Sequence, residues 1–248
     1  MVTTLHGRRL HMLPEVSAGG FSRHDGTVEF YLRVNALVDT RSVVLDYGAG
    51  RGKYTEDAVK FRRNLQQLHG KAKRVIGVDV DAAVTENPNL DEAHVVALSD
   101  RLPIGNATVD MIVSDFTFEH IKDPSWTAAE LTRVLRPGGW ICARTPNRWG
   151  TIAVPARLVP NRLHDLVLRR VQPQKEARDT FPTFYRLNDA AALHKYFPTR
   201  AFRHCSYTHD SEPAYVGRSA TAWSLFFALA AVTPSPFRSM LLVFIQKR

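Results

Sequence analysis

Short apolar segments alternate with amphipathic segments along most of this chain. Compact apolar runs with few polar interruptions are typical of strands that are buried on both faces of a parallel sheet. Segments in which apolar residues recur every three or four positions are typical of helices. The alternation therefore predicts an α/β fold, an open and mostly parallel sheet with helices on both faces. We expect strands at 42–45, 75–78, 94–98, 110–114, 140–144, 202–208 and 241–245, and helices at 26–38, 54–68, 125–135, 188–196 and 220–232.

Two parts of the chain do not follow this alternation. Residues 1–25 show no sustained period and are expected to be irregular, whereas residues 148–187 hold four prolines and predict an inserted cap with one helix near 162–171. Asn188 would cap the helix that follows the insertion. We therefore expect a single domain, made of an N-terminal lid and helix (1–40), a core (41–147), the cap insertion (148–187), and C-terminal helices with the last two strands (188–248).

The composition is that of a soluble globular protein, with 44% hydrophobic and 23% charged residues. A net charge of +9 admits an anionic partner such as nucleic acid or a lipid headgroup, but an ordinary basic surface is the preferred interpretation. No run of Lys and Arg is long enough to form a nucleic-acid arm. The longest apolar run, 222–232, is about half the ~20 residues that a membrane-spanning helix needs.

These properties lead us to expect a cytoplasmic protein without a membrane span, because the first residues also lack the apolar stretch of a signal peptide. We do not expect nucleic acid as a partner. Contact with a membrane surface is an alternative that the sequence leaves undecided. The sequence does not indicate an oligomeric state. Cys142 and Cys205 are expected to be reduced core thiols. No His, Cys or carboxylate cluster has metal-ligand spacing, so no metal is expected.

A glycine-rich segment follows the first predicted strand. Asp46 precedes glycines at 48, 50 and 52, and glycine lets a backbone turn sharply and approach a ligand closely because it lacks a Cβ atom. The helix expected next would present free N–H groups at the carboxyl edge of the sheet, where open α/β sheets bind ligands. The spacing is GxGxG, whereas the dinucleotide fingerprint is GxGxxG, which disfavours a nicotinamide dehydrogenase.

A second acidic residue, Asp79, closes the next predicted strand. A carboxylate at this position can accept both hydroxyl groups of a ribose through charge-assisted hydrogen bonds. The alternative is an aspartate that only caps a strand end or a helix. Together with the glycine-rich segment, Asp79 favours a nucleotide-like ligand.

Several blocks of the sequence, in this order, resemble those of class I S-adenosylmethionine-dependent methyltransferases. The resemblance covers roughly Val43 to Asn147, with the last strand added at the end of the chain. It implies methyl transfer from S-adenosyl-L-methionine and a seven-stranded Rossmann-like sheet whose last strand is antiparallel. The blocks are VVLDYGAGRG, VIGVDVD, RLPIGNATVDMIVSDFTFEHI, LRPGGWICARTPN and LLVFIQK.

The resemblance also implies which residues would bind the cofactor. The glycine-rich segment and Asp46 would hold the methionine half of the cofactor. Asp79 would hold the ribose. Residues later in the chain would contact the adenine and the side of the sulfonium. Leu98 stands where the family often has an aspartate, so adenine recognition would rest on backbone groups, Ser99 or Asp100. The cofactor residues expected from this resemblance are Asp46, Gly48, Ala49, Gly50, Gly52, Asp79, Val80, Ser99, Asp100, Asp115 and Phe116.

Methyl transfer to an oxygen requires removal of a proton, and histidine is the usual base near neutral pH. His120 follows the fourth predicted strand and is the candidate base, although the Glu119–His120 pair could instead anchor the loop. In the cap, Tyr185 and Arg186 could clamp a sugar ring or a phosphate, or could pack the cap onto the sheet.

The expected function is therefore O-methylation of a small-molecule or saccharide acceptor. A lipid or quinone precursor is one alternative, and RNA is another. The alternative of a nucleic-acid substrate is weakened because residues 114–117 read SDFT instead of the Asn/Asp-Pro-Pro-aromatic motif of enzymes that methylate amino groups of nucleic acids.

Overall fold

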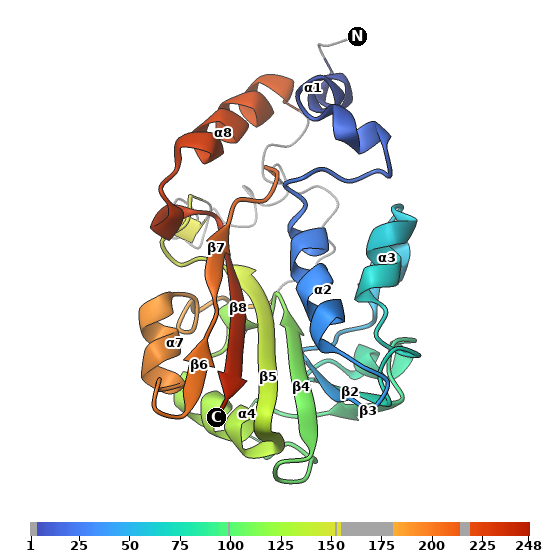
Figure 1. The fold of residues 1–248 in the computed structure, drawn as a ribbon, viewed down its shortest axis with the longest axis vertical. Coiled ribbons are helices and arrows are strands. Elements are labelled where there is room, and N and C mark those ends of the chain that lie inside the picture. The colour runs from blue at the N-terminus through green and yellow to red at the C-terminus, as the bar shows by residue number, and fades with distance from the viewer. Residues whose placement is uncertain (1–3, 99, 152, 155–180, 214–218) are drawn as a thin grey trace. The chain divides into compact units, whose positions relative to one another are not determined.

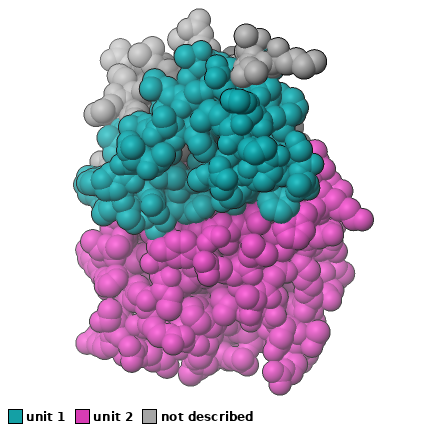
Figure 2. Space-filling view, turned by 45° about the horizontal axis from the view of Figure 1, so that its top comes forward, with its two compact units in different colours: residues 1–26, 146–182, 208–240 teal, residues 27–145, 183–207, 241–248 magenta. Residues whose placement is uncertain are grey.

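The computed structural model of this chain has an open β-sheet with helices on both faces (Figure 1). The chain divides into two compact units (Figure 2). The first unit comprises 1–26, 146–182 and 208–240, and the second comprises 27–145, 183–207 and 241–248. The structure describes residues 4–98, 100–151, 153–154, 181–213 and 219–248. The helix expected near 162–171 lies outside the described residues.

The sheet has eight strands in the order β3-β2-β1-β4-β5-β8-β6, with β7 paired to β8. The first five strands are parallel, and β6 and β8 are antiparallel to each other. This topology confirms the predicted open, mostly parallel sheet. The strands are β1 (Val43–Tyr47), β2 (Arg74–Asp79), β3 (Glu92–Val95), β4 (Val109–Asp115), β5 (Leu135–Pro146), β6 (Phe202–His204), β7 (Tyr207–His209) and β8 (Met240–Lys247).

Where seven strands were expected, eight form because the segment at 202–208 is divided into β6 and β7. The Phe244 N–H in β8 donates to the Ser206 hydroxyl at 3.1 Å, so a side chain takes the place of a backbone acceptor between the two strands. Cys205 lies in the same interruption and is exposed, so the expectation that it is a core thiol is wrong. Cys142 in β5 is buried as expected.

Helices and 3-10 turns connect the strands. Asp123 accepts hydrogen bonds from the N–H groups of Ser125 and Trp126, and Pro124 occupies the first turn of α4, a favourable combination for starting a helix. The helices are α1 (Leu5–Met12), α2 (Gly26–Leu37), α3 (Lys60–Gln66), α4 (Pro124–Val134), α7 (Ala190–Tyr196) and α8 (Ala220–Val232). The 3-10 turns are η1 (Pro14–Ser17), η2 (Lys53–Glu56), η3 (Ala82–Glu86), η4 (Phe118–His120) and η6 (Ser235–Phe237).

The expected helix at 54–68 is interrupted, since only the turn η2 and the seven-residue helix α3 form there. Asp57 is the reason. Its carboxylate accepts from the Val59 N–H at 2.8 Å and from the Arg62 guanidinium at 2.6 and 2.7 Å. This local bonding competes with continuous helix and restarts the chain at Lys60. The glycine-rich segment therefore leads into a 3-10 turn instead of a long helix.

Two further expectations about the helices are wrong. Residues 1–25 are not wholly irregular, because the Thr4 side chain accepts from the Gly7 N–H and starts α1. Asn188 does not cap α7, because Asp189 does so by accepting from the Ala192 N–H at 2.8 Å. Asn188 is instead fully buried and belongs to the network described below.

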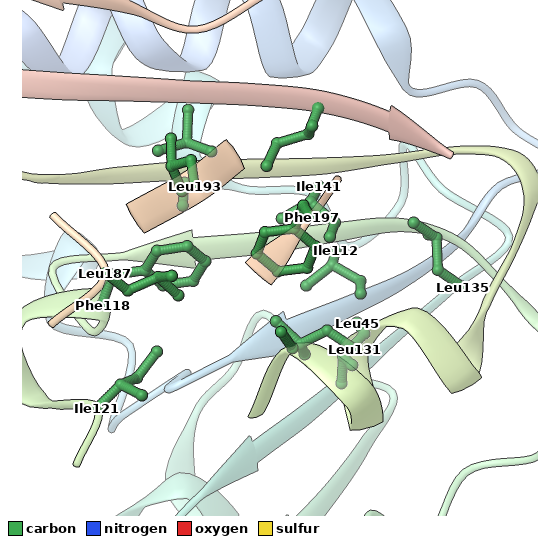
Figure 3. Packing of buried hydrophobic residues seen from close by; sticks show 14 of the residues in the cluster. Leu45, Ile112, Phe118, Ile121, Leu131, Leu135, Ile141, Leu187, Leu193 and Phe197 are labelled. Atoms are coloured by element: carbon green, nitrogen blue, oxygen red, sulfur yellow. The ribbon is translucent and has the colours of Figure 1, made fainter. Parts of the chain in front are cut away.

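The core of the second unit lies between the sheet and its helices (Figure 3). Leu45 of β1, Ile112 of β4 and Ile141 of β5 are fully buried there. Leu131 of α4 and Phe197, which directly follows α7, pack against the same cluster. This packing fixes the strands in register and so determines where each strand ends. Among the described residues, no helix combines the length and apolar character needed to cross a bilayer.

Candidate functional site

Three aspartates meet at the carboxyl edge of the sheet. Asp46 lies near the end of β1, and Asp79 and Asp115 are the last residues of β2 and β4. Since β1 lies between β2 and β4 and is parallel to both, the register places the three acids at the same edge. All three acids were expected from the sequence as candidate site residues, and their convergence follows from the parallel pairing of the strands.

The glycine-rich segment is tied to the end of β2 by its own backbone. The N–H groups of Gly48 and Ala49 donate to the Val78 carbonyl at 2.8 and 3.2 Å. The Gly50 N–H donates to the Asp79 carboxylate at 2.8 Å. The Asn87 side-chain amide also holds the segment, because it donates to the Ala49 and Gly50 carbonyls at 2.9 and 3.1 Å. Asn87 was not among the residues expected from the sequence, because nothing in the sequence places it beside this loop.

Gly48 and Gly50 differ in what surrounds them. Both have a positive φ, at 79° and 53°, which L side chains rarely adopt. A Cβ atom on Gly48 would overlap the Thr117 side chain, lying 2.8 Å from the Thr117 Cβ. A Cβ atom on Gly50 would meet no atom within 4 Å. Gly48 is therefore required for packing, whereas Gly50 borders open space in which a ligand could approach the backbone.

We expect Gly48→Ala to destabilise the protein by about 2–4 kcal/mol, from left-handed strain together with overpacking. Gly50→Ala should cost only the strain, about 1–2 kcal/mol. Urea denaturation of both variants in the absence of ligand measures the difference, and each glycine is the control for the other. Equal losses of stability would show that the contact with Thr117 is unimportant.

Asp46 has an unusual electrostatic environment. It is partly buried, and no described residue donates a hydrogen bond to its carboxylate. Burial first, and then the charges of Asp115 and Asp79, raise the pKa of the Asp46 carboxyl to about 7. A cationic ligand group would favour the charged form and relieve this penalty. The site is therefore suited to a ligand that brings positive charge.

The carboxylate of Asp115 is paired with a cation, in contrast to that of Asp46. Arg144 of β5 donates to both carboxylate oxygens of Asp115 at 2.7 Å, and the Tyr31 hydroxyl lies 3.4 Å from one of them. Phe116, the next residue, has a φ of 55° and a ring that is 42% exposed. Arg144 lies within the block LRPGGWICARTPN, but nothing in the sequence assigned it a role at the site. Its role depends on the pairing of β4 with β5.

The residues expected near the adenine lie beyond Asp79. The Val80 side chain is 43% exposed and the Leu98 side chain 63% exposed. Asp100 is exposed, and its carboxylate accepts from the Ala97 N–H at 3.3 Å. Ser99 lies outside the described residues. The adenine assignments therefore stay predictions.

Glu119 anchors the turn that carries His120. The buried Glu119 carboxylate accepts from the Thr145 hydroxyl at 2.8 Å, and the Asn188 amide donates to the same hydroxyl at 2.5 Å. His120 is only partly buried, and its N–H donates to the Thr117 carbonyl at 2.9 Å. Glu119 thus anchors the turn, and the role of the His120 side chain stays a prediction.

The segment with Tyr185 and Arg186 lies against the same turn. The N–H groups of Phe184 and Tyr185 donate to the Glu119 carbonyl at 2.7 and 3.2 Å. Tyr185 has a φ of 52°, and such strained residues cluster at functional sites. Arg186 is exposed and donates to the Lys122 carbonyl at 2.7 Å. The structure therefore brings Tyr185 to the turn of His120. The residues expected as a lid at the N-terminus belong to the other unit.

The arrangement combines an open glycine-rich backbone, a carboxylate that lacks a partner among the described residues, and a second carboxylate at the neighbouring strand end. It can hold a ligand with a cationic group and a pair of hydroxyls. Among the described residues, no group of three or more His, Cys, Asp or Glu side chains is placed to hold a metal ion.

Comparison with known proteins shows what this chain is similar to. The model of the family described as "Methyltransferase domain" matches residues 45–143. A Mycolicibacterium smegmatis protein named "probable S-adenosylmethionine-dependent methyltransferase" is 36% identical over 110 residues, covering 42% of this chain and 38% of that protein. The ubiquinone biosynthesis O-methyltransferase of Albidiferax ferrireducens is 29% identical over 107 residues, covering 42% of this chain and 41% of its own length. The chain thus spans about two fifths of these relatives.

A solved structure shares the fold. Geranyl diphosphate C-methyltransferase from Streptomyces coelicolor A3(2), crystallised with S-adenosyl-L-homocysteine, superposes with a TM-score of 0.51 and 13% identity. The match covers 89% of this chain and 78% of that chain. At this identity the likeness concerns the fold alone.

Proposed function

Because the chain belongs to the class I S-adenosylmethionine-dependent methyltransferase family, we propose that it transfers a methyl group from S-adenosyl-L-methionine to an oxygen of a small-molecule or saccharide-type acceptor. The observation that supports this proposal best is the Asp46 carboxylate, which is raised in pKa to about 7 and has no hydrogen-bond donor among the described residues. S-adenosyl-L-methionine carries an ammonium group that would supply the missing partner.

The residues at the carboxyl edge fit this cofactor. Asp46 would bind the ammonium group, and the open space at Gly50 would admit the methionine portion to the backbone. Asp79 accepts one backbone N–H at each oxygen, from Gly50 and Asp81, and is thereby oriented to accept the ribose hydroxyls. When bound, the cofactor supplies a sulfonium carbon with a good leaving group. Alignment of the acceptor against that carbon then accounts for much of the rate.

The acceptor side would be formed by Phe116, His120 and Tyr185. His120 is proposed to remove the acceptor proton, because its turn is already fixed by Glu119 and its imidazole is partly accessible. Tyr185 and Arg186 are proposed to position the acceptor. The O-methyltransferase among the relatives supports oxygen as the target atom.

The experiment that tests the function is calorimetry of the full chain with three compounds. S-adenosyl-L-methionine and S-adenosyl-L-homocysteine should bind, and NAD should not. Both cofactor forms contain the ammonium and ribose groups that the site is proposed to recognise, whereas the GxGxG spacing does not fit a dinucleotide. Binding of NAD alone would overturn the proposal.

A lipid or quinone precursor is a second candidate acceptor, favoured by one surface of the first unit. Helix α8 has no charged residue and packs on α1 through Trp223, which is 2% exposed. Leu225, Leu229 and Val232 lie three and four residues apart, so they share one face, and they are 69%, 46% and 76% exposed. Arg8 of α1 lies in the same unit. An exposed apolar helix face on a chain of net positive charge suits the surface of an anionic bilayer.

We expect this face to bring the protein to vesicles that contain phosphatidylserine more than to vesicles of phosphatidylcholine alone, because the chain carries a net charge of +9. Flotation measures the bound fraction. Leu225→Glu combined with Val232→Glu should abolish binding, whereas Leu32→Glu, at another exposed leucine, should not. Equal flotation of both variants, or self-association that only the first variant removes, would exclude the bilayer as the partner of α8.

A further inference from the structure

Arg144 is a buried cation near the carboxyl end of β5. The residue is 6% exposed. Its Nε and Nη2 atoms donate to the two oxygens of Asp115 at 2.7 Å each, and its Nη1 atom donates to the Thr27 hydroxyl at 2.8 Å. A two-pronged contact of this kind fixes both side chains, because the guanidinium fork matches the carboxylate.

The same residue holds Phe116. The Phe116 N–H donates to the Arg144 carbonyl at 2.8 Å, and the guanidinium lies 4.7 Å from the centre of the Phe116 ring. On the other side, the guanidinium lies 5.8 Å from the Phe30 ring of α2. The left-handed conformation of Phe116 is strained, so it needs such support from its surroundings.

The three aspartates at this edge are therefore not equivalent. Arg144 donates a hydrogen bond to each carboxylate oxygen of Asp115, and backbone N–H groups donate to the carboxylate of Asp79. Asp46 has no such donor among the described residues. If Asp115 lacked its partner, two bare carboxylates would lie at adjacent strand ends and each would disfavour ionisation of the other.

We propose that Arg144 is a positioning residue that withdraws Asp115 from ligand binding and holds Phe116 at the acceptor side, so that the cationic group of the cofactor is directed to Asp46. This inference rests on the proposed function. Other groups near Asp46 do not replace Arg144. Asp79 is acidic. Tyr31 and Tyr54 are neutral near pH 7, as tyrosine hydroxyls ordinarily are, and burial raises the pKa of both further.

The test is calorimetry with S-adenosyl-L-homocysteine across a range of pH, with the wild type and three variants. In Arg144→Gln the uncompensated charge of Asp115 should move the pH midpoint of binding upward by about one unit or more. In the double variant Asp115→Asn, Arg144→Gln both charges are absent, and the midpoint should return to the wild-type value or below. Arg136→Gln is the matched control, since Arg136 pairs with Asp110 near the opposite ends of β5 and β4. It should leave the midpoint unchanged.

A merely structural role predicts a different pattern. Affinity would then fall equally at every pH, and the double variant would be no better than Arg144→Gln; either result overturns the inference. If Arg144→Gln does not fold, the double variant still decides, because it keeps a neutral pair and should bind with the wild-type midpoint. If the wild type binds no S-adenosyl-L-homocysteine, the proposed function is wrong and this inference falls with it.

Discussion

Replacing Asp46 by asparagine should stabilise the ligand-free protein above pH 7 and weaken its binding of S-adenosyl-L-homocysteine. Burial, Asp115 and Asp79 raise the pKa of Asp46 from an ordinary value of 3.8 to about 7. The folded state thus binds this proton more tightly than the unfolded state, and stability falls as the pH rises from about 4 to about 7. Asparagine avoids this penalty, which amounts to at most about 4 kcal/mol.

Urea denaturation should therefore show the largest stabilisation by Asp46→Asn at about pH 8, shrinking toward about pH 4. Calorimetry should show a loss of affinity of about 10- to 150-fold, the range expected when a hydrogen bond to a charged group is lost. Asp39→Asn is the control. Backbone and side-chain hydrogen bonds from Arg41 lower the pKa of Asp39, so this variant should gain no stability and should bind normally. Unchanged affinity in Asp46→Asn would refute the role of Asp46.

Replacing His120 by alanine should reduce methyl transfer by roughly 10²–10⁴-fold, the usual contribution of a general base. The turn should survive, because the His120 backbone N–H donates to Thr117 and the Glu119 carboxylate is held by Thr145. Affinity for S-adenosyl-L-homocysteine and thermal stability should stay near wild type. Transfer of radiolabelled methyl groups from S-adenosyl-L-methionine into a panel of phenolic and saccharide acceptors measures the effect.

Two further variants separate catalysis from anchoring. His69→Ala removes a half-exposed histidine that pairs with Asp91 and should not alter turnover. Glu119→Gln weakens the buried contact with Thr145, and should lower stability together with turnover. If His120→Ala keeps the wild-type rate, the base lies elsewhere. If it loses stability as Glu119→Gln does, His120 is part of the anchor.

Local signals in the sequence were sufficient to bring three acids to one edge of the sheet. Asp46 lies near the end of its strand, Asp79 and Asp115 end theirs, and the carboxyl ends meet once the strands pair in parallel. The glycines at 48 and 50 were also visible, because a left-handed turn selects this residue type wherever it occurs. For the acids and the glycines, the residues that reveal the feature in the sequence are the same residues that form it in the structure, or lie next to them.

Other expectations failed because a single side chain formed a hydrogen bond that the periodic pattern does not reveal. The helix expected at 54–68 is broken by Asp57, and the strand expected at 202–208 is divided where Ser206 accepts from Phe244. Periodicity averages over many positions, so it cannot register one side chain that competes with the backbone. The same limit applies to Asn188, whose position suggested a helix cap and whose actual partner is Thr145.

The sequence by itself carried the family resemblance, the alternation that predicts a parallel sheet and the acids that follow its strands, because each is a local pattern along the chain. Only the tertiary structure decided which of these acids is open to a ligand. Arg144 donates to Asp115 across a strand pair, and the buried Thr145 hydroxyl donates to Glu119 and accepts from Asn188. These partners are far apart in the chain, so their contacts exist only after the strands have packed. The unequal hydrogen bonding of Asp46 and Asp115 is therefore a property of the fold.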